Sequence, residues 1–291
     1  FTSFGLGWNN GGPAAIAWGW PILAAFIMLI GFCMSELVSA YPTSGGIYWW
    51  AAKLGGPKAG YYTGWLNLIG LVAILASVAY GSATFLDLTL GTLSESWLAG
   101  YSLNRVFVMF LVILVVVAVI NIFSSHLLAV INNISVWWHV AGAAAVILIL
   151  WLIPEQHASF GDVFAKTINN SGMFGGATSG FGWLLLVLPI SAILTQYTIT
   201  GYDASAHLSE ETKSAANAAA KGIWRSIFYS AIGGWILLLS FLFAVQDSDG
   251  VSKAGGAVAS IFSQALTSKW AAMVLFISTA GQLFCTTACQ T

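Results

Sequence analysis

The chain has 291 residues, of which 58% are hydrophobic and only 7% are charged, and its mean hydropathy is +0.86. A soluble domain carries about 25% charged residues, so a soluble protein of this size could not solvate its surface. The formal net charge is -1 and no basic cluster is present, which argues against a nucleic-acid partner. These properties predict a polytopic protein embedded in a lipid bilayer.

Runs without charged residues predict seven spanning helices after a short first piece, residues 1–12. Each run is long enough for a helix to cross a hydrocarbon core of about 30 Å, and none shows the alternation of a membrane strand. We therefore expect an all-α, polytopic transmembrane helix bundle. The seven runs are Ala14–Ser35, Ala59–Leu86, Val106–Ser125, Leu127–Pro154, Gly182–Tyr202, Ser226–Gln246 and Trp270–Thr291.

The segments between these runs alternate between the two sides of the membrane. On the first side they hold five Lys and Arg residues, and on the second side four. The positive-inside rule then places the first side in the cytoplasm. Within the last segment, residues 256–268 are expected to form a short surface helix. The first side comprises Glu36–Lys58, His126 and Asp203–Arg225, and the second Asp87–Arg105, Glu155–Phe181 and Asp247–Lys269.

Both ends of the chain fall inside apolar segments. Phe1 is not a start methionine, and Trp270–Thr291 stops without the aromatic or cationic anchor that normally closes a span. We therefore expect one transmembrane domain over residues 1–291, truncated inside a helix at both ends.

The first candidate site is the stretch ITGYDASAHLSEET, residues 199–212. Gly201 can interrupt a helix at membrane depth, and such a break persists only where it faces protein or a water-filled cavity. Transporters use the exposed half-helix ends to bind substrate charges. Asp203, His207 and Glu210 follow at i, i+4 and i+7, on one helical face. The alternative is that the helix ends at Gly201 and a cytoplasmic loop follows.

The second candidate is the Gly-rich stretch that begins at Glu36. It lacks the Gly-Lys-Ser/Thr ending of a phosphate-binding loop and follows a helix, so nucleotide binding is not expected. We interpret it as a tight cytoplasmic turn between two spans, with Glu36 and Lys53 at the membrane interface.

The third candidate is His139, near the middle of the fourth long span. Ser125, Asn132 and Ser135 lie within about 80° of it on a helical wheel. An ionisable residue inside a membrane is a functional candidate by default. The alternative is a histidine that only hydrogen-bonds a neighbouring helix.

Enzyme and channel functions are less well supported. No Ser-His-Asp set, metal-binding cluster or pair of carboxylates can be assembled from the sequence, so we expect no catalytic residues, no metal and no cofactor. A channel would need a pore signature or a ring of like charges, and neither is found.

Two motifs carry a family resemblance. MSELVSAYPTSGGIYWWAAKLGGP (34–57) and QYTITGYDASAHLSEET (196–212) resemble the amino acid–polyamine–organocation superfamily of permeases. The similarity is greatest to the branch of GABA, choline and bidirectional amino-acid permeases, and it runs over essentially the whole chain. It implies a leucine-transporter-like fold with inverted repeats, whose first and sixth helices are broken mid-membrane. On that template the chain covers the end of helix one through most of helix eight.

The resemblance also implies roles for individual residues. Tyr197 matches a substrate-contacting position, and the sixth-helix break falls on Thr200, Gly201 and Tyr202, which we expect to bind substrate. Asp203 stands where relatives carry an acidic residue that links gating to protonation. His139 stands where some proton-coupled members carry a lysine, a departure that leaves the coupling ion open. With Glu36, these two residues form the expected coupling and gating set.

The function implied is a secondary active transporter in the plasma membrane. It would move amino acids or related amines such as GABA by alternating access, with H⁺ as the expected coupling ion. The alternatives are an amino-acid exchanger or a sodium-coupled transporter of the same fold, and, less favoured, a membrane-embedded enzyme or a channel.

Overall fold

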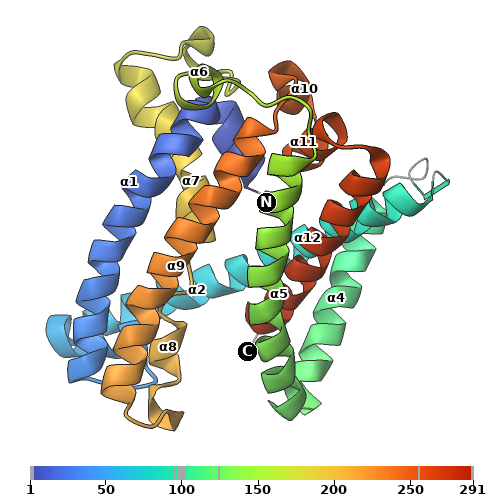
Figure 1. Cartoon of the computed structure of the whole chain (residues 1–291). Coiled ribbons are helices and arrows are strands. Elements are labelled where there is room, and N and C mark those ends of the chain that lie inside the picture. Colours follow the sequence, from blue (N-terminus) through green and yellow to red (C-terminus); the bar gives the residue numbers. More distant parts are fainter. Residues whose placement is uncertain (1–2, 95, 98–101, 124, 255, 290–291) are drawn as a thin grey trace. The chain divides into compact units, whose positions relative to one another are not determined.

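The computed structural model describes residues 3–94, 96–97, 102–123, 125–254 and 256–289 (Figure 1). In the described part of the chain, six helices are long and apolar enough to cross a membrane. The prediction of an all-α, multi-pass membrane protein is therefore confirmed. The six are α1 (Phe4–Ala40), α2 (Gly46–Leu93), α4 (Leu103–Phe123), α5 (Ser125–Leu152), α9 (Ala215–Phe243) and α12 (Ser268–Cys289).

Shorter elements connect these helices. Residues 257–265 form a helix inside the segment where the sequence predicted one, 256–268. The other short elements lie between α5 and α9, or between α9 and α12. In chain order they are α6 (Phe160–Phe164), η1 (Met173–Gly176), η2 (Trp183–Val187), α7 (Leu188–Thr198), α8 (Ala204–His207), η3 (Ser209–Glu211), α10 (Ser248–Lys253) and α11 (Ala257–Ala265).

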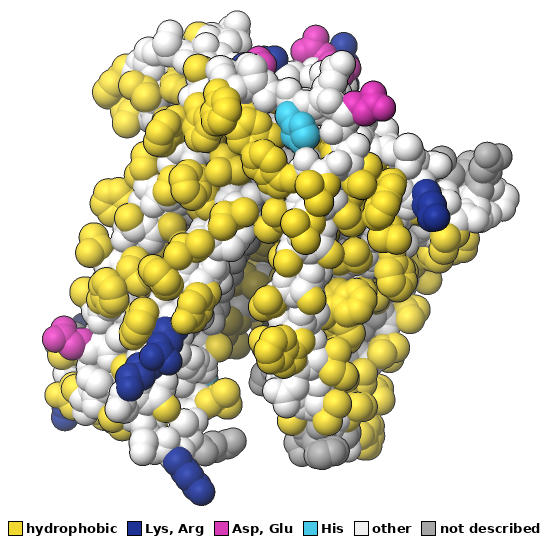
Figure 2. All heavy atoms as spheres, in the orientation of Figure 1, with side chains coloured by type: hydrophobic (Ala, Val, Ile, Leu, Met, Phe, Trp, Pro, Cys, Tyr) yellow, Lys and Arg dark blue, Asp and Glu magenta, His cyan; other side chains and the backbone are white. Residues whose placement is uncertain are grey.

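The chain divides into two compact units. The first comprises residues 1–68, 158–243 and 248–257, and the second comprises residues 69–157, 244–247 and 258–291. Each unit is described by itself below. In the view of Figure 2, hydrophobic side chains cover most of the helical surface in both units, and only scattered charged side chains are visible.

A glycine bends the first helix of the first unit. Gly12 has φ +76°, a conformation that glycine adopts readily, and Pro13 follows it. The Ala14 N–H donates to the Lys166 oxygen at 3.0 Å, outside the helix. The neighbouring loop therefore satisfies a backbone group that the bend releases from the helix.

The rest of α1 packs antiparallel to α9, beside it in Figure 1. Hydrogen bonds from side chains of one helix to backbone oxygens of the other join the two along their length. Small residues allow the close approach: Gly31 faces Ile227, and Gly234 faces the ring of Trp20. The bonded pairs are Trp20 with Ala231, Trp235 with Ala17 and Ser35 with Ala220, at 2.8, 2.9 and 3.0 Å.

Buried hydroxyl groups hold the second unit together. The Thr89 and Thr279 hydroxyls lie 2.6 Å apart, and those of Ser82 and Thr286 lie 2.5 Å apart, so two pairs join α2 to α12. All four residues are buried. Hydroxyl pairs of this kind are a common link between membrane helices, because lipid offers no other partner.

Three predicted loops were too long by several residues. The predicted loop 36–58 is a turn of only five residues, because α1 continues to Ala40 and α2 begins at Gly46. The predicted loop 87–105 is shortened because α2 continues to Leu93, and the predicted loop 203–225 because α9 begins at Ala215. Charges marked these boundaries in the sequence, but a helix carries charges beyond the apolar core without ending.

Candidate functional site

Two short helical pieces lie side by side in the first unit and form the frame of the candidate site. Residues 4–11 of α1 pack against α7, with the Ser191 hydroxyl donating to the Gly7 oxygen at 3.2 Å. A β-carbon added to Gly7 would lie 3.0 Å from Leu194, and one added to Gly11 would lie 2.7 Å from the Ser191 hydroxyl. Glycines at these two positions thus permit close contact of the backbones.

The pairing shows that these pieces are antiparallel. Gly11 lies against Ser191 and Gly7 against Leu194, so residues 4–11 run in the direction opposite to α7. The end of α7 at Thr198 carries the partial negative charge of a helix C-terminus.

The segment after α7 is not helical. The helix ends at Thr198, and the chain resumes helical geometry only at Ala204. Gly201 in this gap has φ +79°, and an added β-carbon would meet no heavy atom within 4 Å. The chain therefore leaves helical geometry two residues before Gly201.

Pro189 explains the wide turn at the start of α7. Residues 183–187 form a π-helix, and the Leu188 N–H donates to the Trp183 oxygen. Proline has no N–H and its ring would clash with the carbonyl four residues earlier, so a wider turn relieves that clash. At about 1.5 Å per residue, the apolar helix from Trp183 to Thr198 is about 24 Å long. That is shorter than a hydrocarbon core of about 30 Å, so the interruption follows before a full crossing.

A polar cluster follows the interruption. The His207 Nε2 lies 3.5 Å from the Asp203 carboxylate, and its Nδ1 lies 3.0 Å from the Ser44 oxygen. The Ser44 N–H donates to the Glu210 carboxylate at 3.1 Å. His207 and Glu210 thus contact the α1–α2 turn at Ser44, and Asp203 joins them through His207.

The charges in this cluster shift each other's protonation. The hydrogen bond that His207 donates to the Asp203 carboxylate raises the pKa of His207, although partial burial opposes this shift. The hydrogen bond from His207 lowers the pKa of Asp203, again against the effect of burial. Both residues follow the apolar segment and lie outside every segment that is apolar enough to span. Both pKa shifts favour the state in which His207 is protonated and Asp203 is ionised.

The remaining predicted site residues of the first unit lie close to the interruption or at the end of α1. Tyr197 is half-buried near the end of α7, Thr200 and Gly201 are exposed in the gap, and Tyr202 is half-buried beside Asp203. Glu36 is exposed near the end of α1, and among the described residues its carboxylate has no ion-pair partner. The structure therefore does not bring Glu36 into the cluster.

His139 belongs to the second unit, lies near the middle of α5 and is exposed there. Its Nδ1 donates to the Ser135 oxygen at 2.7 Å, one turn earlier in α5. In the neutral ring, Nε2 then carries the lone pair. That atom faces α12, where a β-carbon added to Gly281 would lie 3.7 Å from it. Asn132 and Ser135 share its helix, and the Ser125 side chain lies outside the described residues.

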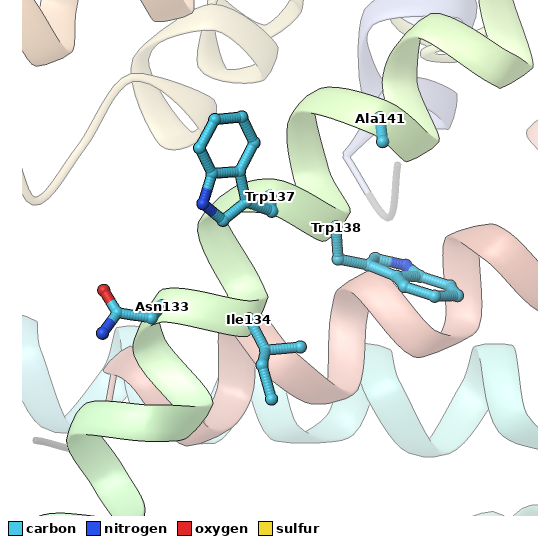
Figure 3. Close-up of a pocket in the computed structure, with 5 residues that line it drawn as sticks. All are labelled: Asn133, Ile134, Trp137, Trp138 and Ala141. Atoms are coloured by element: carbon cyan, nitrogen blue, oxygen red, sulfur yellow. The ribbon is translucent and has the colours of Figure 1, made fainter.

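A hollow along α5 is a weaker candidate (Figure 3). Its lining residues come from one helix, and Figure 3 shows that Trp137 and Trp138 point away from each other. Trp138 donates its ring N–H to the Ile277 oxygen at 3.1 Å, so its polar group is already bonded to α12. The only other polar side chain in the lining is Asn133. A zwitterionic ligand would find no convergent charges here.

Two features of the first unit escaped sequence reasoning. Ser44 takes part in the cluster through backbone groups, which no side-chain pattern reveals. Gly46 adjoins the His207 ring and has φ +45°, and an added β-carbon would lie 3.2 Å from that ring. The Gly-Gly pair was noticed as a turn signal, but its partner lies more than 150 residues away in the chain.

The sequence of the chain matches the family model described as "Amino acid permease" over residues 1–286. The chain belongs to the amino acid permease family. This family consists of permeases rather than enzymes, and the structural features described above fall within the matched region.

Curated members of the permease family are similar to the chain over most of its length. The amino-acid permease BAT1 of Arabidopsis thaliana is 31% identical, and the BAT1 homologue of Oryza sativa subsp. japonica is 32% identical; each comparison covers 92% of this chain and 53% of the relative. The GABA-specific permease of Saccharomyces cerevisiae is 29% identical, over 92% of this chain and 47% of its own length. The chain thus spans about half the length of the curated relatives it matches.

Proposed function

We propose that the protein to which this chain belongs is a secondary active transporter of amino acids or related amines, such as GABA. It works by alternating access in the plasma membrane. The observation that carries the proposal is the break in helical geometry between the end of α7 at Thr198 and Ala204, with Gly201 at φ +79° in the gap. The carbonyl groups freed at such a helix end carry partial negative charge and suit the ammonium group of an amino acid or amine.

The substrate would contact the interruption itself. We assign substrate binding to Tyr197, Thr200, Gly201 and Tyr202, which lie at the end of α7 and in the gap after it. The open space around Gly201 supports this assignment, since a ligand could approach the backbone there. The names of the relatives support amino acids in general, and one supports GABA in particular.

The decisive experiment is uptake by the full-length protein in proteoliposomes, with labelled amino acids and amines. A transporter is expected to give saturable accumulation of one substrate group, unchanged chemically. Loss of label into a new compound would favour an enzyme, and flux that does not saturate would favour a channel. Uptake that requires substrate on the opposite side would identify an exchanger.

A substitution at the interruption tests the site. Gly201→Leu is expected to reduce uptake by more than about tenfold, because a side chain at φ +79° is strained and fills the approach to the backbone. Gly233→Leu is a matched control, since an added β-carbon there also meets no heavy atom within 4 Å, but it lies inside regular helix α9. Equal uptake by both variants would refute the assignment.

We further propose that H⁺ is the coupling ion and that Asp203 and His139, with Glu36 as a gating residue, serve this role. In this proposal Asp203 supplies a fixed negative charge beside the interruption, because His207 lowers its pKa, and the His139 ring contributes Nε2, which faces α12. Uptake is expected to rise as external pH falls from about 8 to 6, a range that includes the ordinary histidine pKa of about 6.5. It should not change when potassium replaces sodium; a strict sodium requirement would exclude this proposal.

Two variants separate the coupling residues. His139→Gln keeps a hydrogen-bonding group but cannot titrate, so the pH profile of uptake should flatten. His157→Gln is the control, because His157 lies outside the candidate site. Asp203→Asn should reduce uptake more strongly than His139→Gln, because it removes a charge beside the interruption. A full pH dependence in His139→Gln would show that His139 only packs.

A further inference from the structure

The turn between α1 and α2 is held by the segment that follows the helix interruption. Ser44 provides both contacts through its backbone: its oxygen faces His207 and its N–H donates to Glu210. Because the bonds use main-chain atoms, they fix the position of the turn itself and not of one side chain. A change in the protonation of the His207 ring therefore changes a contact with the backbone of the turn.

The two ring nitrogens of His207 face acceptors. Nδ1 lies 3.0 Å from the Ser44 carbonyl oxygen, and Nε2 lies 3.5 Å from the Asp203 carboxylate. Neither acceptor can donate a proton, so a neutral imidazole, with one N–H, can serve only one of them. Only the protonated ring serves both at once. The geometry thus selects the imidazolium form independently of any other argument.

The surrounding elements leave the ring room in this position. Gly46 places no side chain against the ring, since an added β-carbon would lie 3.2 Å from it. On the other side, Ser205 of α8 contacts Gly222 of α9, so α8 is supported by a long helix. The charged groups around the ring are Asp203 from α8 and Glu210 from η3. In the described part of the chain, α9 contributes no ion pair to His207.

We infer that His207 is a positioning residue that, when protonated, latches the segment after the interruption to the α1–α2 turn. The His207 latch consists of Asp203, His207 and Glu210 on one side and the Ser44 backbone on the other. The neutral ring donates to only one of its two acceptors, and the charged Asp203 carboxylate is the stronger one, so the bond to the Ser44 oxygen is the one that is lost and the turn loosens. The inference concerns the fold of the first unit and does not depend on which substrate is transported.

The direction of the pH dependence follows from the two partners. The pKa of His207 is raised, so the latch is complete below about pH 6.5 and is lost as pH rises through the raised value. The pKa of Asp203 is lowered, so its charge is present above its ordinary value of 3.8 and is lost only as pH falls below that. The latch is therefore closed in mildly acidic solution and opens as pH rises through the raised pKa of His207.

Hydrogen exchange measures the latch without any substrate. In the full-length protein in nanodiscs, the protection factor of the Ser44 amide, corrected for the intrinsic rate, is followed from pH 5.5 to 8.5. The Ser44 N–H donates to Glu210, and this bond depends on the turn being held in place by the His207 contact with the Ser44 oxygen. Protection is therefore expected to fall about threefold to tenfold across this range, because the amide opens more often once that contact is lost. A protection factor that is constant with pH in the unmodified protein would overturn the inference.

Variants assign the transition to His207. His207→Gln should give low protection at every pH, and Asp203→Asn should move the midpoint to lower pH because the group that raises the His207 pKa is gone. His157→Gln is the matched control and should keep the original profile. Protection in α9 serves as the check that each variant is folded. An unchanged midpoint in a folded Asp203→Asn or His207→Gln variant would contradict the latch.

Discussion

A buried carboxylate near the end of α2 shows how single residues stabilise the second unit. Asp87 is 3% exposed, and its carboxylate lies 2.7 Å from the Arg105 guanidinium at the start of α4. The Trp97 ring N–H donates to the same carboxylate at 3.1 Å, and the guanidinium stacks over the Trp97 ring. A buried charge is stable only when it is paired in this way, so each of these groups depends on the others.

Removing the charge of Asp87 should destabilise the protein. Asp87→Asn leaves the Arg105 guanidinium without its counter-charge and is expected to cost about 2–3 kcal/mol. The measurement is the thermal midpoint of the purified full-length protein. Glu155→Gln, which alters an exposed carboxylate, provides the control and should leave the midpoint unchanged. Equal midpoints for the two variants would mean that the pair contributes nothing to stability.

Residue patterns predicted one half of the polar cluster and not the other. Helical spacing grouped Asp203, His207 and Glu210 correctly, because a period is a local property. Their partner at Ser44 is set by tertiary packing and uses backbone atoms, so no pattern of side chains could reveal it. His139 illustrates the same limit. A helical wheel defines the face on which it lies, but not whether that face is covered.

The same three-residue sequence occurs at the bend of two helices. Gly-Gly-Pro occurs at 11–13 in α1 and at 55–57 in α2, and the middle glycine has φ +76° in the first and φ +83° in the second. Proline cannot continue the helix pattern, and glycine adopts the left-handed conformation that the bend needs. The surroundings differ: an added β-carbon would lie 2.6 Å from the Ile168 nitrogen at Gly12 but would meet nothing within 4 Å at Gly56.

Gly12 and Gly56 share a backbone conformation but differ in surroundings, so substitutions at the two positions can be compared directly. Gly56→Ala is expected to lower the free energy of unfolding by about 1 kcal/mol, through backbone strain alone. Gly12→Ala carries the same strain and also displaces the loop at Ile168, so its loss should be larger by at least about 1 kcal/mol. Thermal midpoints of the two full-length variants compare them directly. A similar loss for both would show that the loop adapts to a side chain without cost.

The elements themselves were largely predictable, and their ends were not. Charge-free runs located the spanning helices because a bilayer demands long apolar segments whatever their neighbours are. The runs stopped at Leu86 and Ser35, whereas the helices continue to Leu93 and Ala40. Charge marks the edge of the apolar core, but the hydrogen bonds of the backbone decide where a helix ends.

At the scale of the molecule, the first unit fixes which segments face opposite sides of the membrane. From Pro13 to Ala40, α1 extends about 42 Å at about 1.5 Å per residue, more than a core of about 30 Å. Lys166 lies at one end of this length, since its oxygen accepts from the Ala14 N–H. Lys221 lies at the other end, beside Ala220, whose oxygen accepts from the Ser35 hydroxyl. We therefore expect the membrane to separate the two lysines.

Cysteine labelling tests this separation and its direction together. The charge count of five to four, with the family resemblance, places Lys221 in the cytoplasm and Lys166 outside. Both side chains are exposed, so a cysteine at either position can react. In intact cells that express the full-length protein, a membrane-impermeant maleimide should label Lys166→Cys and leave Lys221→Cys unlabelled. After permeabilisation both should react, which controls for reactivity. The reverse pattern in intact cells would invert the orientation but preserve the separation, whereas labelling of both would contradict the path of α1 across the membrane.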